Sequence, residues 1–254
     1  YRRKNLAFFT PMMYNISRKF YSTAEIFMQY HIQTTPIWDA FKEECGCPMC
    51  RIYKASEQRL IKQYLGEAVM QPEYRVRVNE RGFCTRHTLA LYKGDNKLGT
   101  ALQFATRIET VNKNIREIKK AKQAKSLALD LQENLDTCVI CDTVDEMMVR
   151  YSYTVAQMFD NEQDFPSLFA VNKGFCMKHF TELLKYVSFA GKSADKYLET
   201  LINVQKKALD KAENDLNMFA SKFDYRNAGR VSDRYDNAIA DAIKLLKGDV
   251  LETT

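Results

Sequence analysis

The spacing of cysteines and histidines constrains this chain more than any other feature. Six of its seven cysteines and two of its three histidines follow one pattern that occurs twice. The pattern is Cys-x2-Cys, then 33 or 34 residues, then Cys-x2-His. Its members are Cys47, Cys50, Cys84 and His87 in the first copy, and Cys138, Cys141, Cys176 and His179 in the second. Equivalent positions lie 91 or 92 residues apart, which predicts an internal duplication.

Each copy offers three thiolates and one imidazole. Residues three apart on a helix project from one face, so each pair can converge on one ion. A Cys3His shell is typical of tetrahedral structural zinc, and we therefore expect two zinc ions per chain. The shorter connection favours ligation within each repeat; crossed ligation, with a Cys pair from one copy meeting the Cys-x2-His of the other, is the alternative.

Other uses of the cysteines explain the pattern less well. Disulfides would suit a secreted chain, but the cysteine count is odd and the paired histidines would have no role. Cys47-Pro48-Met49-Cys50 resembles a thioredoxin-type redox motif, yet no βαβ pattern surrounds it. An iron–sulfur cluster stays open as a minor alternative, because thiolates also bind iron.

Two residues fall outside the pattern. Cys45 has Asp136 as its counterpart in the second copy, so we interpret it as a spare thiol beside the first site. The sharper hypothesis makes Cys45 a redox thiol whose oxidation releases zinc. His31 has no partner in the pattern and is expected to be a surface or packing residue.

Apolar residues recur every three or four positions, which predicts an all-α fold of two tandem helical repeats. We expect helices near 51–66, 84–93, 142–160 and 176–190. Three further amphipathic stripes are expected to face the core, with a seam that faces a partner as the alternative: Leu98, Leu102, Ala105, Ile108, Val111, Ile115 and Ile118; Leu198, Ile202, Leu209, Ala212, Leu216, Phe219 and Phe223; and Val231, Tyr235, Ile239, Ile243 and Leu246.

The expected organisation has three parts. Residues 1–27 read as a basic N-terminal extension, with a natural start near Met28, followed by a first repeat over 28–133 and a second over 134–254. The extension holds five Lys or Arg and one Glu, so most of the net charge of +6 lies there. The remainder is nearly neutral, which disfavours nucleic-acid binding. No run of about 18 apolar residues is present, so no membrane span is expected.

With these motifs in view, the chain resembles a bacterial family found in clostridia and related Firmicutes and catalogued as a domain of unknown function. The resemblance covers about 36–248, from Pro36-Ile37-Trp38 through both Gly-Phe-Cys-x2-His elements to the last helix. The family has Asn-Arg-Leu-Gly where this chain has Asn96-Lys97-Leu98-Gly99. The resemblance implies a cytoplasmic protein and supplies no activity.

Three function classes remain. A zinc-stabilised scaffold that binds a protein or a small ligand ranks first, because no paired-carboxylate or nucleophile–base motif indicates an enzyme. An enzyme or small-ligand binder with a pocket between the repeats ranks second. Its candidate lining is Asp224, Tyr225, Arg226 and Asn227, although an ion pair between Arg226 and Asp224 at a helix end would also explain that cluster. A thiol or zinc redox sensor ranks third.

Overall fold

The computed structural model describes residues 34–135, 137–224, 226 and 233–249. Expectations about the 1–27 extension, Met28, His31 and Val231 lie outside these residues. The described part is helical and contains no strand, which confirms the all-α fold class. None of its helices is both long and apolar enough to span a membrane.

A helix over 34–42 opens the described chain. The α-helices that follow are α2 (Pro48–Leu65), α3 (Pro72–Arg81), α4 (Thr85–Lys93), α5 (Lys97–Arg116), α6 (Ala124–Leu135), α7 (Val139–Asn161), α8 (Phe165–Ala170), α9 (Met177–Lys185), α10 (Ala194–Ser221) and α11 (Ala238–Lys247). Short 3-10 turns lie at η1 (Glu67–Met70), η2 (Ala121–Gln123), η3 (Val187–Ser193) and η5 (Asp233–Tyr235). The four helices expected beside the cysteine pairs are all present.

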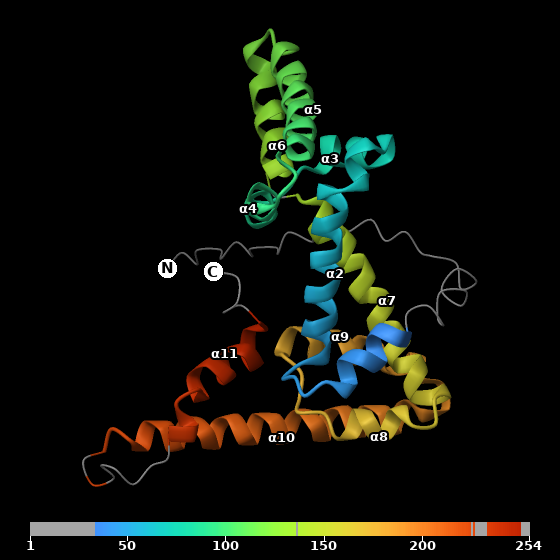
Figure 1. Ribbon diagram of the computed structural model, residues 1–254, viewed down its shortest axis with the longest axis vertical. Coiled ribbons are helices and arrows are strands. Elements are labelled where there is room, and N and C mark those ends of the chain that lie inside the picture. The colour runs from blue at the N-terminus through green and yellow to red at the C-terminus, as the bar shows by residue number, and fades with distance from the viewer. Residues whose placement is uncertain (1–33, 136, 225, 227–232, 250–254) are drawn as a thin grey trace, which may run out of the picture.

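Helices α2 and α7 form the centre of the molecule. They pack along each other and run in opposite directions, so the start of each lies near the end of the other (Figure 1). Met49 and Ile52 of α2 and Ile140 and Val144 of α7 are buried and belong to one apolar cluster. These two central helices come from the two expected repeats.

One apolar core joins both halves of the chain. It extends from Ile37 in the opening helix to Val204 in α10. Part of this core is a group of aromatic rings. The ring centroids of Phe41 and Phe169 lie 5.6 Å apart in a stacked arrangement, and those of Phe159 and Tyr197 lie 5.1 Å apart. The two halves therefore share a core instead of folding around separate ones.

Helices α5 and α6 form an arm that projects beyond the core (Figure 1). The expectation that the α5 stripe faces the core is wrong: Leu98 is 71% exposed and Ile108 is 64% exposed. The buried positions on α5 are Gly99, Thr100 and Gln103. Gly99 lies so close to η1 that an added Cβ would come 2.8 Å from Val69. Small and polar residues therefore make the closest α5 contacts. Phe104 adds a ring contact with Phe83 at 6.1 Å, whereas Leu98 and Ile108 face outward.

The stripe predicted for α10 is displaced around the helix. Tyr197, Leu201 and Val204 are buried, whereas Leu198 and Ile202 of the predicted stripe are each 37% exposed. A shift of one residue turns the buried face by about 100°, because an α-helix has 3.6 residues per turn.

The terminal helix is short and buries small residues. Ala238 and Ala242 of α11 face the core, and Tyr235 just before it is buried, but Ile239 and Leu246 are about half exposed. The helix ends at Gly248, whose φ of +85° is typical of a glycine that terminates a helix.

Candidate metal centres

All four ligand pairs occupy the same place on a helix. In each pair the first cysteine occupies the N-cap position of a helix without a side-chain capping hydrogen bond. The second residue follows three positions later in the first turn: Cys47 and Cys50 on α2, Cys84 and His87 on α4, Cys138 and Cys141 on α7, Cys176 and His179 on α9. The positive end of the helix dipole favours thiolates at these positions. Every pair is thus presented in the same way.

The pairs meet across the two halves. The start of α2 meets the start of α9, which groups Cys47, Cys50, Cys176 and His179 as site one. The start of α4 meets the start of α7, which groups the other four residues as site two. The expectation of ligation within each repeat is therefore wrong. The antiparallel contact of α2 with α7 places the Cys-x2-Cys pair of each half beside the Cys-x2-His of the other.

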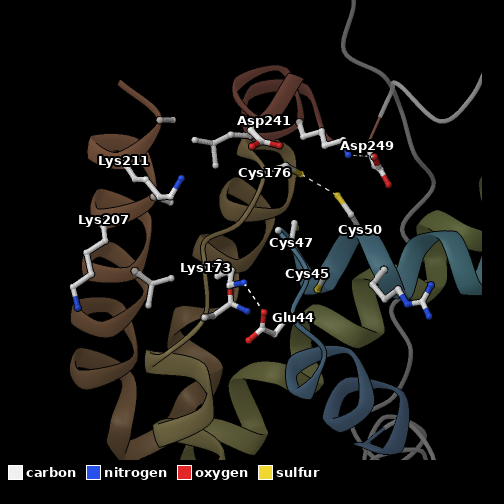
Figure 2. A pocket seen from close by; sticks show the side chains of 18 of the residues that line it. Glu44, Cys45, Cys47, Cys50, Lys173, Cys176, Lys207, Lys211, Asp241 and Asp249 are labelled. Atoms are coloured by element: carbon white, nitrogen blue, oxygen red, sulfur yellow. Dashed lines mark hydrogen bonds and ion pairs between the residues drawn. The ribbon is translucent and has the colours of Figure 1, made fainter. Parts of the chain in front are cut away.

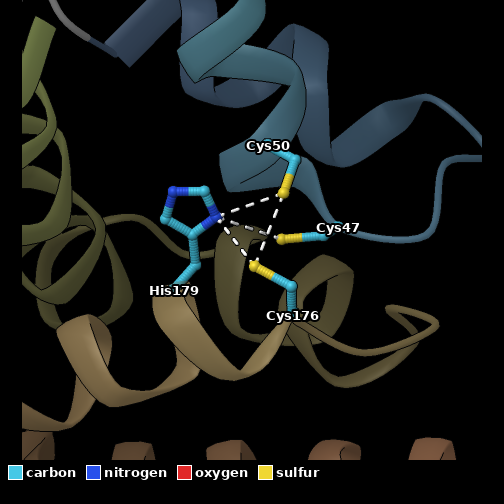
Figure 3. Close-up of side chains that lie close together, drawn as sticks. All are labelled: Cys47, Cys50, Cys176 and His179. Atoms are coloured by element: carbon cyan, nitrogen blue, oxygen red, sulfur yellow. Dashed lines mark hydrogen bonds between the residues drawn. The ribbon is translucent and has the colours of Figure 1, made fainter. Parts of the chain in front are cut away.

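Site one has the dimensions of a tetrahedral zinc shell (Figure 3). The Nδ1 atom of His179 lies 3.6, 3.3 and 3.2 Å from the Sγ atoms of Cys47, Cys50 and Cys176. The Cys50 and Cys176 sulfurs are 3.5 Å apart. Zn–S and Zn–N bonds of about 2.3 and 2.0 Å in a tetrahedron require S···S and S···N separations of about 3.8 and 3.5 Å. The four ligand atoms fit such an ion.

Site two repeats this geometry. Nδ1 of His87 lies 3.3, 3.2 and 3.4 Å from the sulfurs of Cys84, Cys138 and Cys141, and the Cys84 and Cys141 sulfurs are 3.9 Å apart. In both sites the imidazole faces the sulfurs through Nδ1, which leaves Nε2 to contact the surrounding protein. The same ion fits both sites.

The thiols of site one compete for protons. Hydrogen bonds from Cys47 and Cys50 lower the pKa of Cys176 far below its usual value. Burial and the contact with Cys176 raise the pKa of Cys47 well above it, and the same contact raises the pKa of Cys50 to about 12. Without an ion, one thiolate is thus stabilised by neighbouring thiols. A bound cation would replace those protons and favour all three thiolates.

The pKa values of site two shift for the same reason, and the carboxylate of Glu57 adds to the shift of His87. Hydrogen bonds from Cys141 and His87 lower the pKa of Cys138 to about 3, and the contact with Cys138 raises the pKa of Cys141. Burial lowers the pKa of His87, but hydrogen bonds to Cys138 and Glu57 outweigh it and raise that pKa to about 9.

The surroundings of the two histidines differ. Oε1 of Glu57, on α2, lies 2.9 Å from Nε2 of His87, and Arg86 pairs with the same carboxylate oxygen at 2.8 Å. A carboxylate on the second nitrogen orients a metal-binding histidine and increases its basicity. Nε2 of His179 is buried and has no hydrogen-bond partner among the described residues. Sequence reasoning missed Glu57, and no spacing or motif in the sequence marks it.

A cavity of about 730 Å³ opens beside site one (Figure 2). Cys47, Cys50 and Cys176 line it, together with residues from both halves of the chain, and no residue of site two does. Helix α11 ends here, where a Cβ on Gly248 would lie 3.7 Å from the Cys50 sulfur and 3.6 Å from the Cys176 sulfur. One side of the cysteine cluster is thus reached from this cavity.

Cys45 lines the same cavity but does not belong to the four-residue cluster. Its sulfur donates to the carbonyl oxygen of Ala40 at 3.6 Å. Burial and the nearby Glu43 raise its pKa above the usual thiol value. A raised pKa reduces the fraction of Cys45 present as thiolate.

The polar cluster near the end of α10 lies elsewhere. Arg226 Nη2 pairs with Asp224 Oδ2 at 2.6 Å, and neither residue lines the cavity beside site one. This contact is the ion pair offered as the alternative to a ligand site. Tyr225 and Asn227 lie outside the described residues.

The fold and the two clusters define an all-helical protein with two Cys3His-type groups that could hold metal ions. The chain belongs to a family of unknown function, DUF6062, whose model matches residues 28–253. No curated protein and no solved structure matches the chain.

Proposed function

We propose that this protein is a zinc-binding helical scaffold in which two ions join the two halves of the chain. The observation that carries this proposal is the convergence of four helix N-termini into two clusters of tetrahedral dimensions. Three thiolates and one imidazole favour zinc over magnesium or calcium, which prefer oxygen ligands. Both shells are complete with four protein ligands, so neither leaves a position open for catalysis.

The ions contribute folding free energy, because the ligand pairs are brought together only in the folded chain. A bridge from α2 to α9 and another from α4 to α7 fix the antiparallel arrangement of the central helices. Six cysteines used as metal ligands fit a reducing compartment, where thiols stay free of disulfides. We therefore place the protein in the cytoplasm.

The test is metal content per chain by elemental analysis, with an absorption spectrum, on full-length protein purified without chelator. The expected result is two zinc ions and no visible absorption. Iron with a sulfide-to-iron charge-transfer spectrum would make the protein an iron–sulfur protein instead. A well-folded, metal-free chain would contradict the proposal.

The scaffold role requires a binding partner, and two features support one. The outward apolar residues of α5, among them Leu98 and Ile108, offer a surface for another protein. Small-ligand binding is a second candidate function, favoured by the cavity between the halves. Its wall carries both signs of charge, with Lys173 paired to Glu44 and Lys211 paired to Asp215, so polar ligands of either sign fit it.

The anionic dye 1-anilinonaphthalene-8-sulfonate distinguishes these two surfaces. Dye bound in the cavity should lose its fluorescence in Ala212→Phe, since Ala212 lines the cavity, and keep it in Leu98→Glu. The opposite pattern would assign the dye to α5 and leave the cavity without a ligand-binding role.

A further inference from the structure

The two metal clusters share their ligands and dimensions, but their surroundings differ in two independent ways. The first difference is the partner of the histidine that completes each cluster. The second is a cavity against the sulfurs of site one, which no residue of site two lines. Both differences indicate that site one binds its ion less tightly than site two.

The histidine of site one lacks the hydrogen-bond acceptor that the histidine of site two has. His179 is only 4% exposed, and its Nε2 atom contacts no acceptor among the described residues. When Nδ1 binds a cation, Nε2 carries a proton, and a buried N–H without an acceptor is costly. In site two the same atom of His87 donates to Glu57 at 2.9 Å.

The two central helices also differ in sequence at the position of Glu57. Glu57 follows Cys47 on α2 by ten residues, and the residue ten positions after Cys138 on α7 is Met148. Met148 is 5% exposed. If the halves arose by duplication, one central helix provides a carboxylate at this position and the other a thioether. Asp145, one turn earlier on α7, instead has its Oδ1 atom 3.9 Å from Nζ of Lys178 and is mostly exposed.

Each cluster has two buried and two half-buried residues, but site one also adjoins a cavity. Three cysteines of site one line a cavity of about 730 Å³, which leaves room for a small chelating molecule against their sulfurs. Other lining residues come from α10 and α11, among them Lys207 and Ala212 on α10 and Asp241 on α11. A ligand entering here would meet the thiolates without unfolding α2 or α9.

We infer that site one is a metal-exchange site, which loads and releases a divalent zinc-like cation through the adjoining cavity, while site two retains its ion. The inference rests on the proposed zinc-binding function and gives the two sites different roles. Removing a hydrogen-bonded partner of a metal-binding histidine commonly costs 10- to 100-fold in metal affinity. The release rates of the two sites should differ by a factor of about that size.

The experiment follows metal release from the full-length, zinc-loaded protein into excess 4-(2-pyridylazo)resorcinol, with iodoacetamide labelling at each time point. Peptide mass spectrometry then identifies which cysteines have become reactive. The expected result is two phases, with Cys47, Cys50 and Cys176 labelled in the first and Cys84, Cys138 and Cys141 in the second. Equal rates, or labelling of site two first, would overturn the inference while leaving zinc binding intact. A protein that binds no zinc would instead contradict the proposed function itself.

Two matched variants test the cause. Glu57→Gln should accelerate the slow phase about 10- to 100-fold and leave the fast phase unchanged. Asp145→Asn should change neither phase. A faster first phase in Asp145→Asn would show that Asp145 supports His179 in solution, and would refute the proposed difference between the histidines.

The cavity route has its own variant. Ala212→Phe places a large side chain in the cavity, so chelator-driven release from site one should slow while release from site two stays the same. An unchanged first phase in a variant with native melting would refute entry through the cavity.

Discussion

The sulfurs of Cys50 and Cys176 lie 3.5 Å apart, although 126 residues separate them along the chain. Cys50 is in the first turn of α2, and Cys176 caps α9. An ion held at this point would link the beginning of the first half to the middle of the second. The equivalent contact in site two, between Cys84 and Cys141, links the halves a second time. Each site therefore belongs to the whole molecule and not to one repeat.

This arrangement predicts how loss of one ion affects stability. Cys176→Ser should lose one zinc and lower the free energy of unfolding of the whole chain by several kcal/mol, because the site bridges both halves. Hydrogen exchange should then increase in α2 as well as in α9. Cys45→Ser, the matched control, should keep two zinc ions. Retention of both ions by Cys176→Ser would show that the ligand assignment is wrong.

A buried amide on α10 makes a second prediction. Gln205 is 2% exposed; its Nε2 donates to the carbonyl oxygen of Phe175 at 3.0 Å, and its Oε1 accepts the Phe175 N–H at 3.1 Å. Gln205→Leu leaves both backbone groups of Phe175 unpaired next to Cys176. It should lower the free energy of unfolding, measured by chemical denaturation, by about 2 kcal/mol. Lys206→Gln, on the exposed side of the same helix, should change stability by less than about 0.5 kcal/mol. Equal effects of the two changes would contradict the assigned contacts.

The loop before α9 makes a third prediction. Gly174 has a φ of +123°, and a Cβ there would come 2.5 Å from the Cβ of Ala208. Gly174→Ala should therefore destabilise the protein by more than about 1 kcal/mol through backbone strain and overlap. Gly46→Ala is the comparison, because nothing lies within 4 Å of its added Cβ. Thermal melting measures both, and a neutral Gly174→Ala would mean that this loop is placed differently.

The arm formed by α5 and α6 makes a fourth prediction. Leu98 and Ile108 face solvent, so Leu98→Glu and Ile108→Glu should each change the free energy of unfolding by no more than about 0.5 kcal/mol. Ile140 is fully buried at the start of α7, so Ile140→Ala should lower the free energy of unfolding by about 2–5 kcal/mol. Strong destabilisation by Leu98→Glu would place this face in a packed contact.

Sequence reasoning predicts α2, α4, α5, α7, α9, α10 and α11. It does not predict the opening helix, α3, α6 or α8, nor which face of a predicted helix is buried. The period of 3.6 identifies α5 and α10, yet their apolar residues extend around more of the circumference than one core contact needs. On α5 the contact with η1 is close enough to require Gly99, so small residues mark the buried side. On α10 the polar Gln205 is buried because it completes the hydrogen bonds of Phe175. Neither preference can be read from hydrophobicity alone.

Spacing selects the eight residues that converge, but it misleads about their pairing. Chain entropy favours the shorter loop, yet each doubling of loop length costs only about 0.6 kcal/mol. The connection from Cys50 to Cys176 spans 126 residues, against 34 from Cys50 to Cys84, so crossing costs roughly 1 kcal/mol. Packing of α2 along α7 buries enough apolar surface to exceed that. Glu57 could not be predicted at all, because it meets His87 only through this crossing.

The most direct test of the central claim is to remove one ligand and identify which cysteines lose protection. Cys50→Ser, loaded with zinc and treated with iodoacetamide, should lose one ion and expose Cys47 and Cys176 to alkylation. Cys84 should stay protected in site two with Cys138 and Cys141. If Cys84 becomes alkylated while Cys176 stays protected, the ions lie within the repeats and the crossed arrangement is wrong.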